Sequence, residues 1–139
     1  MKSILLLLVL IFGSFLTAEE KISPKIEKEI LALINENLRA CQKEDIQAID
    51  RQTDELIRQQ SNMTHARLFY AYDLEYKLIA CRILAAGSNI ATVQAVMEVR
   101  KIKGPAFRNN RTTAVHTLIR RRDGWKFFAT GLQKVEMLP

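Results

Sequence analysis

The chain has 139 residues, 48% of them apolar and 26% charged, with a formal net charge of +6. This length suits one domain, and the apolar content is high enough to form a core without a disulfide framework or a structural metal. The charge is uneven, because residues 19–75 hold 12 acidic and 8 basic side chains whereas residues 76–139 hold 3 acidic and 12 basic. Such asymmetry indicates either contact with nucleic acid or a membrane, or an acidic helical layer packed on a basic sheet.

The first 20 residues, MKSILLLLVLIFGSFLTAEE, have the pattern of a secretory signal peptide. Lys2 precedes an apolar run that ends near Leu16, which is short for a membrane span of roughly 20 apolar residues. We expect a signal peptide over residues 1–18, export to the periplasm or the medium, and one mature domain over residues 19–139. We expect no membrane contact after cleavage and no nucleic-acid partner, because exported proteins rarely meet nucleic acid.

Helical patterns come first along the mature chain. Ser23-Pro24 predicts a helix start with a hydroxyl N-cap, and apolar residues then share one stripe at Ile26, Ile30, Leu33, Ile34, Leu38 and Cys41. Asp45 predicts the cap of a second, shorter helix that carries Ile46, Ile49 and later Leu56 and Ile57. The segment QQSNMT is expected to interrupt the helical pattern. A third helical piece is then expected through Arg67, Leu68 and Phe69.

From about Asp73 the apolar period changes to two, which is typical of strands. The predicted strands are YDLEYKLIACRIL, IATVQAVMEVRKI, TTAVHTLIRRR and WKFFATGLQKVEML, and the first three are separated by the turn signals AAGSN and KGPAFRNNR. Helices followed by antiparallel strands predict an α+β fold, with three N-terminal helices packed on one face of the sheet.

The stretch HTLIRRRDGWKFF combines three arginines with three aromatic residues, so it requires a choice between a nucleic-acid surface and a hairpin. Asp123-Gly124 between two alternating runs predicts a type I′ hairpin turn. In that register the facing pairs are Arg122 with Trp125, Arg120 with Phe127, and Leu118 with Ala129. The arginines are then divided between two faces at a hairpin tip, and no nucleic-acid-binding motif accompanies them.

The order of elements resembles the nuclear-transport-factor-2-like superfamily, which includes SnoaL-like proteins and ketosteroid isomerase. YDLEY enters the sheet and HTLIRRRDGWKFF closes it, and GPAFRNNRTTAVHTL adds a likeness to small exported bacterial members. The resemblance spans about Ser23 to Leu138. It implies a cone-like domain whose strongly curved sheet wraps an interior pocket, often with dimerisation through the outer face of the sheet. The superfamily includes enzymes, ligand-binding proteins and assembly domains.

The candidates for lining that pocket are Tyr72, Tyr76 and His116. The two tyrosines share a strand face, and each brings an apolar ring with a polar tip. Enzymes of the superfamily use an acid or a His–Asp pair, whereas the sequence places no carboxylate beside His116 to orient it as a base. We therefore predict no catalytic residue, no metal site and no cofactor.

The chain contains two cysteines, Cys41 in the first helix and Cys81 in the first strand. An exported protein meets an oxidising environment, in which the pair is a candidate disulfide. Both residues also lie in apolar stripes, where a free thiol packs as a small hydrophobic group. The sequence leaves both alternatives open.

Two functional hypotheses follow. The first is an exported non-enzymatic module for binding or assembly, which uses the pocket for a small apolar ligand or uses a sheet face. The alternative is a small pocket enzyme of the isomerase, dehydratase or hydrolase kind. Apolar side chains on both faces of the last hairpin predict a homodimer, because helices cover only one face. The candidates for the dimer face are Leu118, Trp125 and Phe127.

Overall fold

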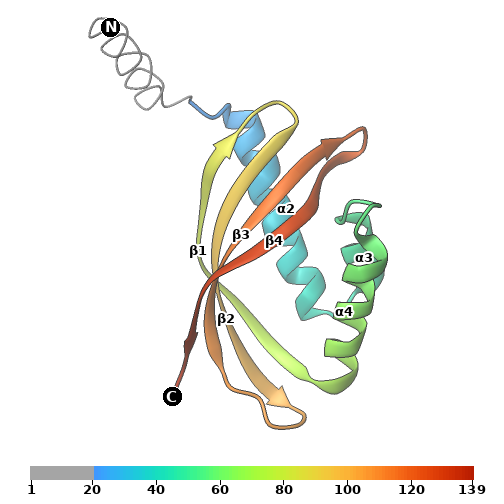
Figure 1. The fold of residues 1–139 in the computed structure, drawn as a ribbon, viewed down its shortest axis with the longest axis vertical. Coiled ribbons are helices and arrows are strands. Elements are labelled where there is room, and N and C mark those ends of the chain that lie inside the picture. The colour runs from blue at the N-terminus through green and yellow to red at the C-terminus, as the bar shows by residue number, and fades with distance from the viewer. Residues whose placement is uncertain (1–20) are drawn as a thin grey trace, which may run out of the picture.

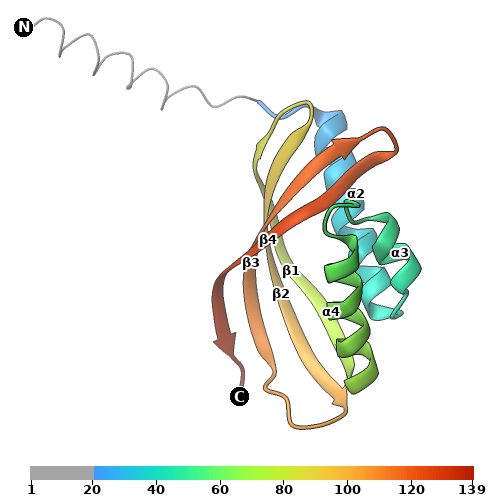
Figure 2. The same ribbon diagram turned by 45° about the vertical axis from the view of Figure 1, so that its right-hand side comes forward.

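A computed structural model describes residues 21–139, so the signal peptide predicted over residues 1–18 lies outside the described residues. The elements are α2 (Pro24–Gln42), α3 (Ile46–Arg51), α4 (Arg58–Ala71), β1 (Asp73–Ala86), β2 (Ile90–Lys103), β3 (Asn110–Arg121) and β4 (Gly124–Met137). The four strands form one antiparallel sheet in chain order, and the three helices lie on one side of it (Figures 1 and 2). The predicted α+β class is confirmed. None of the described helices is long and apolar enough to cross a membrane.

Helix α2 forms where the sequence predicts it and lies across the inner face of the sheet, the face toward the helices. Ser23 precedes Pro24, but its backbone carbonyl, rather than its hydroxyl, accepts the bond from the Glu27 N–H at 3.0 Å. The apolar stripe of α2 packs into the main hydrophobic core, whose buried members are Ile30, Leu33, Ile34, Ala91, Val93, Leu118 and Trp125. Burial of this stripe fixes α2 against the sheet.

The next two helices differ from the sequence prediction. Asp45 caps α3 as expected, because its Oδ1 accepts a bond from the Ala48 N–H at 3.0 Å. The assignment of Leu56 to this helix is wrong, since α3 ends at Arg51 and Leu56 is 73% exposed. The predicted break at QQSNMT is also wrong, because α4 runs through it. Asn62 Nδ2 donates to both carboxylate oxygens of Asp50, at 3.1 and 3.0 Å, and so attaches this polar segment to α3.

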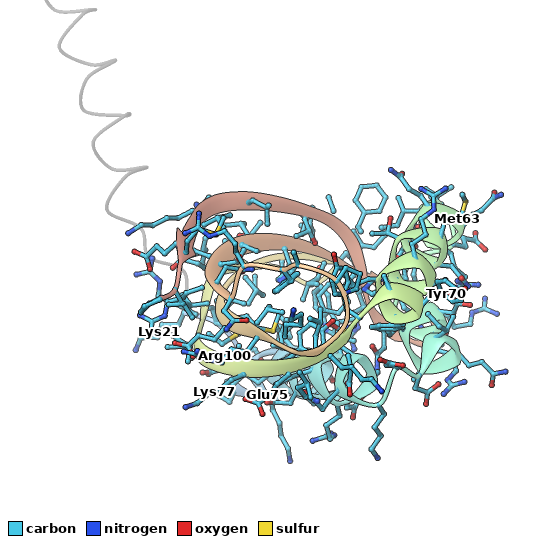
Figure 3. All side chains as sticks on the ribbon, turned by 90° about the horizontal axis from the view of Figure 1, so that it is seen from below. Lys21, Met63, Tyr70, Glu75, Lys77 and Arg100 are labelled. Atoms are coloured by element: carbon cyan, nitrogen blue, oxygen red, sulfur yellow. The ribbon has the colours of Figure 1, made fainter. Side chains whose placement is uncertain are left out.

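The long strands owe their curvature to irregular pairing. The β1–β2 register shifts between Leu78 and Ala80, and the β3–β4 register shifts between Thr117 and Leu118, among other places. Each extra residue bends its strand and increases its twist. Seen from below, the strands wrap around a set of interior side chains, as the cone-like prediction requires (Figure 3).

The tip of the β3–β4 hairpin does not have the predicted turn. Arg121 pairs with Gly124, and Arg120 pairs with Trp125, which leaves Arg122 and Asp123 as the two turn residues. A type I′ turn needs positive φ at both of these positions, whereas the positive φ of 118° falls on Gly124. The type I′ prediction is therefore wrong, and the facing pairs predicted from it are displaced.

The prediction of a dimer face at Leu118, Trp125 and Phe127 is also wrong. Leu118 is 0% and Trp125 is 6% exposed, and Phe127 packs against the same core beneath α2. The helices cover this face because the α2 stripe requires it for burial. The register places Val115 and Ile119 on the outer face of the sheet, the face away from the helices.

Candidate functional site

The three predicted pocket residues lie in different surroundings. Tyr72 ends α4, its hydroxyl donates to the Ala106 carbonyl at 3.4 Å, and its ring packs on Phe107 with 5.3 Å between ring centroids. Tyr76 packs on a second cluster, formed by Ala40, Cys41 and Ile49. The structure thus places Tyr72 against a loop and Tyr76 under the end of α2.

His116 lies on the inner face, where its Nδ1 is 2.7 Å from Thr130 Oγ1 and its ring meets Phe127 edge-on at 5.2 Å. Burial lowers the pKa of His116 and raises the pKa of Tyr76, which the nearby Cys41 and Glu44 raise further. Both side chains are therefore uncharged at neutral pH. The histidine thus contacts the Thr130 hydroxyl and the Phe127 ring, which is the setting of a packed inner-face residue.

The two cysteines do not form the candidate disulfide. Cys41 is buried and Cys81 is half-buried, and both thiols are free. They belong to different hydrophobic clusters, since Cys81 packs with the main core beneath the middle of α2. Burial raises the pKa of Cys41 to about 11, which keeps it as an unreactive thiol at neutral pH.

A hollow of about 700 Å³ lies between α2, α3 and the β3–β4 hairpin tip, where it forms a groove. We call it the hairpin groove. Glu29, Ala32 and Glu36 of α2 line one part of it, and Arg51 of α3 and Trp125 of β4 line others. Tyr72, Tyr76 and His116 do not line the groove, so it is separate from the interior pocket that the sequence predicted.

Buried polar contacts fix the hairpin tip beside the groove. Arg121 Nε donates to Asp54 Oδ2 at 2.7 Å, and the Asp54 side chain is 1% exposed. Hydrogen bonding to Arg121 holds the pKa of Asp54 below its ordinary value. Lys126 Nζ donates to the Arg51 carbonyl and pairs with Asp123 at 2.9 Å. These contacts join the segment between α3 and α4 to the hairpin.

The same segment also pairs with the edge of β4. The Phe127 N–H donates to the Gln52 carbonyl at 2.8 Å, and the Asp54 N–H donates to the Phe127 carbonyl at 2.9 Å. Thr53 thereby forms a parallel bridge with Phe127, and its side chain is buried. The groove consequently has walls that are held by main-chain bonds on one side and by the α2 core on the other.

The lining of the hairpin groove is charged and mostly basic. Among the described residues it includes seven basic side chains (Arg39, Lys43, Arg51, Arg120, Arg121, Arg122 and Lys126) and four acidic ones (Glu29, Glu36, Asp45 and Asp123). Trp125 Nε1 donates to Glu29 Oε2 at 3.1 Å, and the Arg120 guanidinium lies 6.0 Å from the centre of the indole. The groove thus combines a fixed aromatic ring with surrounding cations.

The sequence pattern points to the hairpin arginines, but it gives no sign that Arg39, Lys43 and Arg51 belong to the same site. They approach the hairpin only through the fold. Within residues 21–139, no group of three or more His, Cys, Asp and Glu side chains is arranged to hold a metal ion.

A family model described as the C-terminal domain of the anti-sigma-I factor RsgI9 matches residues 32–138. No curated protein matches the chain.

Among solved structures, the chain is similar to an NTF2-like protein of unknown function from Pseudomonas putida KT2440. That pair is 15% identical with a TM-score of 0.69, over 81% of this chain and 89% of the other. It is also similar to a protein of unknown function with a cystatin-like fold from Nostoc punctiforme, 10% identical with a TM-score of 0.66, over 86% of this chain and 96% of the other. These structures confirm the NTF2-like fold, and the family match over residues 32–138 shows that the chain belongs to the family of the RsgI9 C-terminal domain.

Proposed function

We propose that this domain is an exported, non-enzymatic assembly module whose outer sheet face binds a second copy of the chain. The observation that carries the proposal is a neutral patch on the outer face of the two central strands. The cross-strand register places its members there, and they are Ile90, Thr92, Val96, Val115, Thr117 and Ile119. Ile90 is 57% exposed although it is a large aliphatic residue. The helices lie on the other side of the sheet, so they leave this patch uncovered (Figure 2).

Charged residues surround the neutral patch in the manner of an interface rim. Toward one end of the strands, Arg111 Nη2 pairs with Glu98 Oε1 at 2.6 Å, and both residues are on the outer face by register. Glu75, Lys77 and Arg100 also point away from the interior (Figure 3). Protein interfaces commonly have such an apolar centre with a polar rim. Pairing of two patches would remove the apolar centre from water while the charges stay solvated.

The patch also offers polar groups that suit a two-fold contact. Gln94 Nε2 donates to Gln133 Oε1 at 2.8 Å, and this bond spans β3 on the outer face. A primary amide has two N–H donors and a carbonyl acceptor, so each amide retains capacity for a further bond. In a two-fold interface the same groups meet their own copies, and a group that both donates and accepts is self-complementary.

The non-enzymatic part of the proposal rests on the setting of His116, whose neighbours are Thr130 and Phe127. Export rests on the signal-peptide pattern of the sequence. A small apolar ligand remains part of the proposal, because Leu132 and Val135 on the inner face of β4 are 68% and 45% exposed. Neither side chain belongs to the hydrophobic clusters that pack beneath the helices.

The test is sedimentation equilibrium of the mature chain, which begins at Glu19, at micromolar concentration. The wild type should sediment as a dimer, and Ile90→Lys should raise its dissociation constant at least about tenfold, because a cation would be buried in the interface. Leu132→Lys is the matched control, since it introduces the same charge at an exposed aliphatic residue on the inner face. A wild-type protein that sediments as a monomer would overturn the proposal.

A further inference from the structure

We propose that the hairpin groove is a binding site for a peptide segment that carries acidic side chains. The groove lies on the helix side of the sheet, so this site is independent of the dimer proposed on the outer face. This site is supported by the groove charges that lack partners, by the elements that contribute them, and by the position of Trp125.

Four cations of the groove lack a charged partner. Arg39, Lys43, Arg51 and Arg122 are exposed and make no ion pair with any residue in 21–139. Arg121 and Lys126, in contrast, pair with Asp54 and Asp123 and hold the walls together. The groove lining therefore contains two kinds of cation: those that support the fold, and those whose N–H groups face solvent. The second kind is available to a ligand with carboxylates.

The unpartnered cations surround the hollow from three elements. Arg39 and Lys43 come from the end of α2, Arg51 from the end of α3, and Arg122 from the hairpin turn. Charges that converge on one groove act together on a ligand, because field lines concentrate where the surrounding walls have low polarisability. A single surface cluster on one helix would not enclose a ligand in this way.

The acidic residues of the groove indicate a peptide rather than a nucleic acid. Glu36 lines the α2 side and is exposed, and Glu29 accepts the indole N–H while it lies 3.9 Å from the nearest Arg120 nitrogen. A phosphodiester backbone carries a negative charge at every nucleotide, so it would be repelled by these carboxylates. A peptide has neutral stretches between its acidic side chains, and its backbone N–H groups can donate to Glu36. A groove lined by both cations and carboxylates thus suits a peptide, which has both acidic and neutral parts.

Part of the groove lining is apolar and suits the apolar parts of such a segment. Ala32, Ala40 and Ala48 contribute only methyl groups, and the Trp125 ring is held by its bond to Glu29. Trp125 is 6% exposed, so its ring offers such a segment a small apolar contact, without loss of side-chain entropy on binding.

Trp125 also makes the site observable, because it is the one tryptophan in the sequence. A blocked peptide of alternating glutamate and alanine is titrated into the mature protein, with the signal read as Trp125 fluorescence and, independently, as heat by calorimetry. We expect saturable binding that weakens as salt concentration rises. The same peptide with glutamine in place of glutamate should bind at least about tenfold more weakly, since it cannot form charge pairs.

The decisive variant is Arg51→Gln combined with Arg122→Gln, which removes two exposed cations that support no contact of the fold. It should weaken binding of the glutamate peptide about tenfold, the effect of two exposed charge pairs. Lys77→Gln is the control, because Lys77 points away from the interior on the opposite face (Figure 3). Absence of binding in calorimetry, an equal loss in Lys77→Gln, or tighter binding of oligothymidylate than of the peptide would each overturn the proposal.

Discussion

Asp54 is a charged residue buried where the chain between α3 and α4 meets the hairpin. Its carboxylate accepts from Arg121 Nε at 2.7 Å and from the Leu56 N–H at 3.2 Å, so its charge is compensated locally. We predict that Asp54→Asn lowers the free energy of unfolding by about 1–3 kcal/mol at pH 7, the usual cost of losing a charge-assisted hydrogen bond. Chemical denaturation monitored by circular dichroism measures the change.

The pH dependence of that difference follows from the direction of the pKa shift. The pKa of Asp54 is lowered in the folded state, chiefly by the hydrogen bond from Arg121, so its ionisation stabilises the fold above the unfolded value of about 3.9. This contribution is lost as pH falls through the folded pKa, and the stability of the wild type and of Asp54→Asn should then converge. Glu55→Gln removes an exposed neighbouring carboxylate and is the control. A difference that persists unchanged at low pH would contradict this account.

At the scale of elements, Gly104 controls how the β2–β3 connection meets the end of α4. Its φ is +129°, and an added Cβ would lie 2.7 Å from the Ala71 carbonyl oxygen and 2.9 Å from Tyr72 Cδ1. Gly124 has a similar φ of +118°, but an added Cβ would meet nothing within 4 Å. We predict that Gly104→Ala costs about 2–4 kcal/mol, from backbone strain and overpacking together.

Gly124→Ala is the matched variant, since it adds the backbone strain without the clash. It should cost about 1–2 kcal/mol, the penalty for an L-residue at positive φ. Thermal unfolding of both variants separates the two effects. Equal destabilisation would show that the contact with Ala71 and Tyr72 adds nothing to the cost of Gly104→Ala.

The elements show which features a sequence can predict. The stripe of α2 and the alternation of the four strands were predictable because their periods match the helix and the strand. Helix α4 was predicted only near its end, since it has no buried residue and therefore no apolar period. The hairpin pattern correctly grouped Leu118 with Trp125, but one strand pair does not determine which face the helices cover. That choice depends on α2, which lies far away in sequence.

The hairpin groove could not be predicted from the sequence, for a related reason. Its unpartnered cations come from separate elements, and at each place the local pattern is that of an ordinary exposed side chain. Only the packing of α2 and α3 beside the hairpin brings Arg39, Arg51 and Arg122 around one hollow. Sequence spacing reports neighbours along an element, whereas this site consists of neighbours across elements.

At the scale of the whole molecule, stability is unevenly distributed. The α2 helix and the sheet share the main core, and α3 joins the second cluster through Ile49, which is 1% exposed. Helix α4 lies at the side of the molecule, and Met63 and Tyr70 point outward from it (Figure 3). Phe69 contacts the second cluster, and Asn62 bonds to Asp50, so α4 is attached mainly to α3. Such a peripheral element can open without exposing the main core.

We therefore predict that the backbone amides of α4 exchange with solvent deuterium at least about tenfold faster than those of α2, because opening α4 costs less than global unfolding. Hydrogen–deuterium exchange with peptide-level mass spectrometry measures both helices in one sample. Asn62→Ala should accelerate exchange in α4 further while exchange in the α2 segment Ile30–Ile34 stays unchanged, since the bond to Asp50 is lost but the main core is intact. If the two helices exchange at the same rate in the wild type, the domain opens as one cooperative unit, and opening α4 does not cost less free energy than global unfolding.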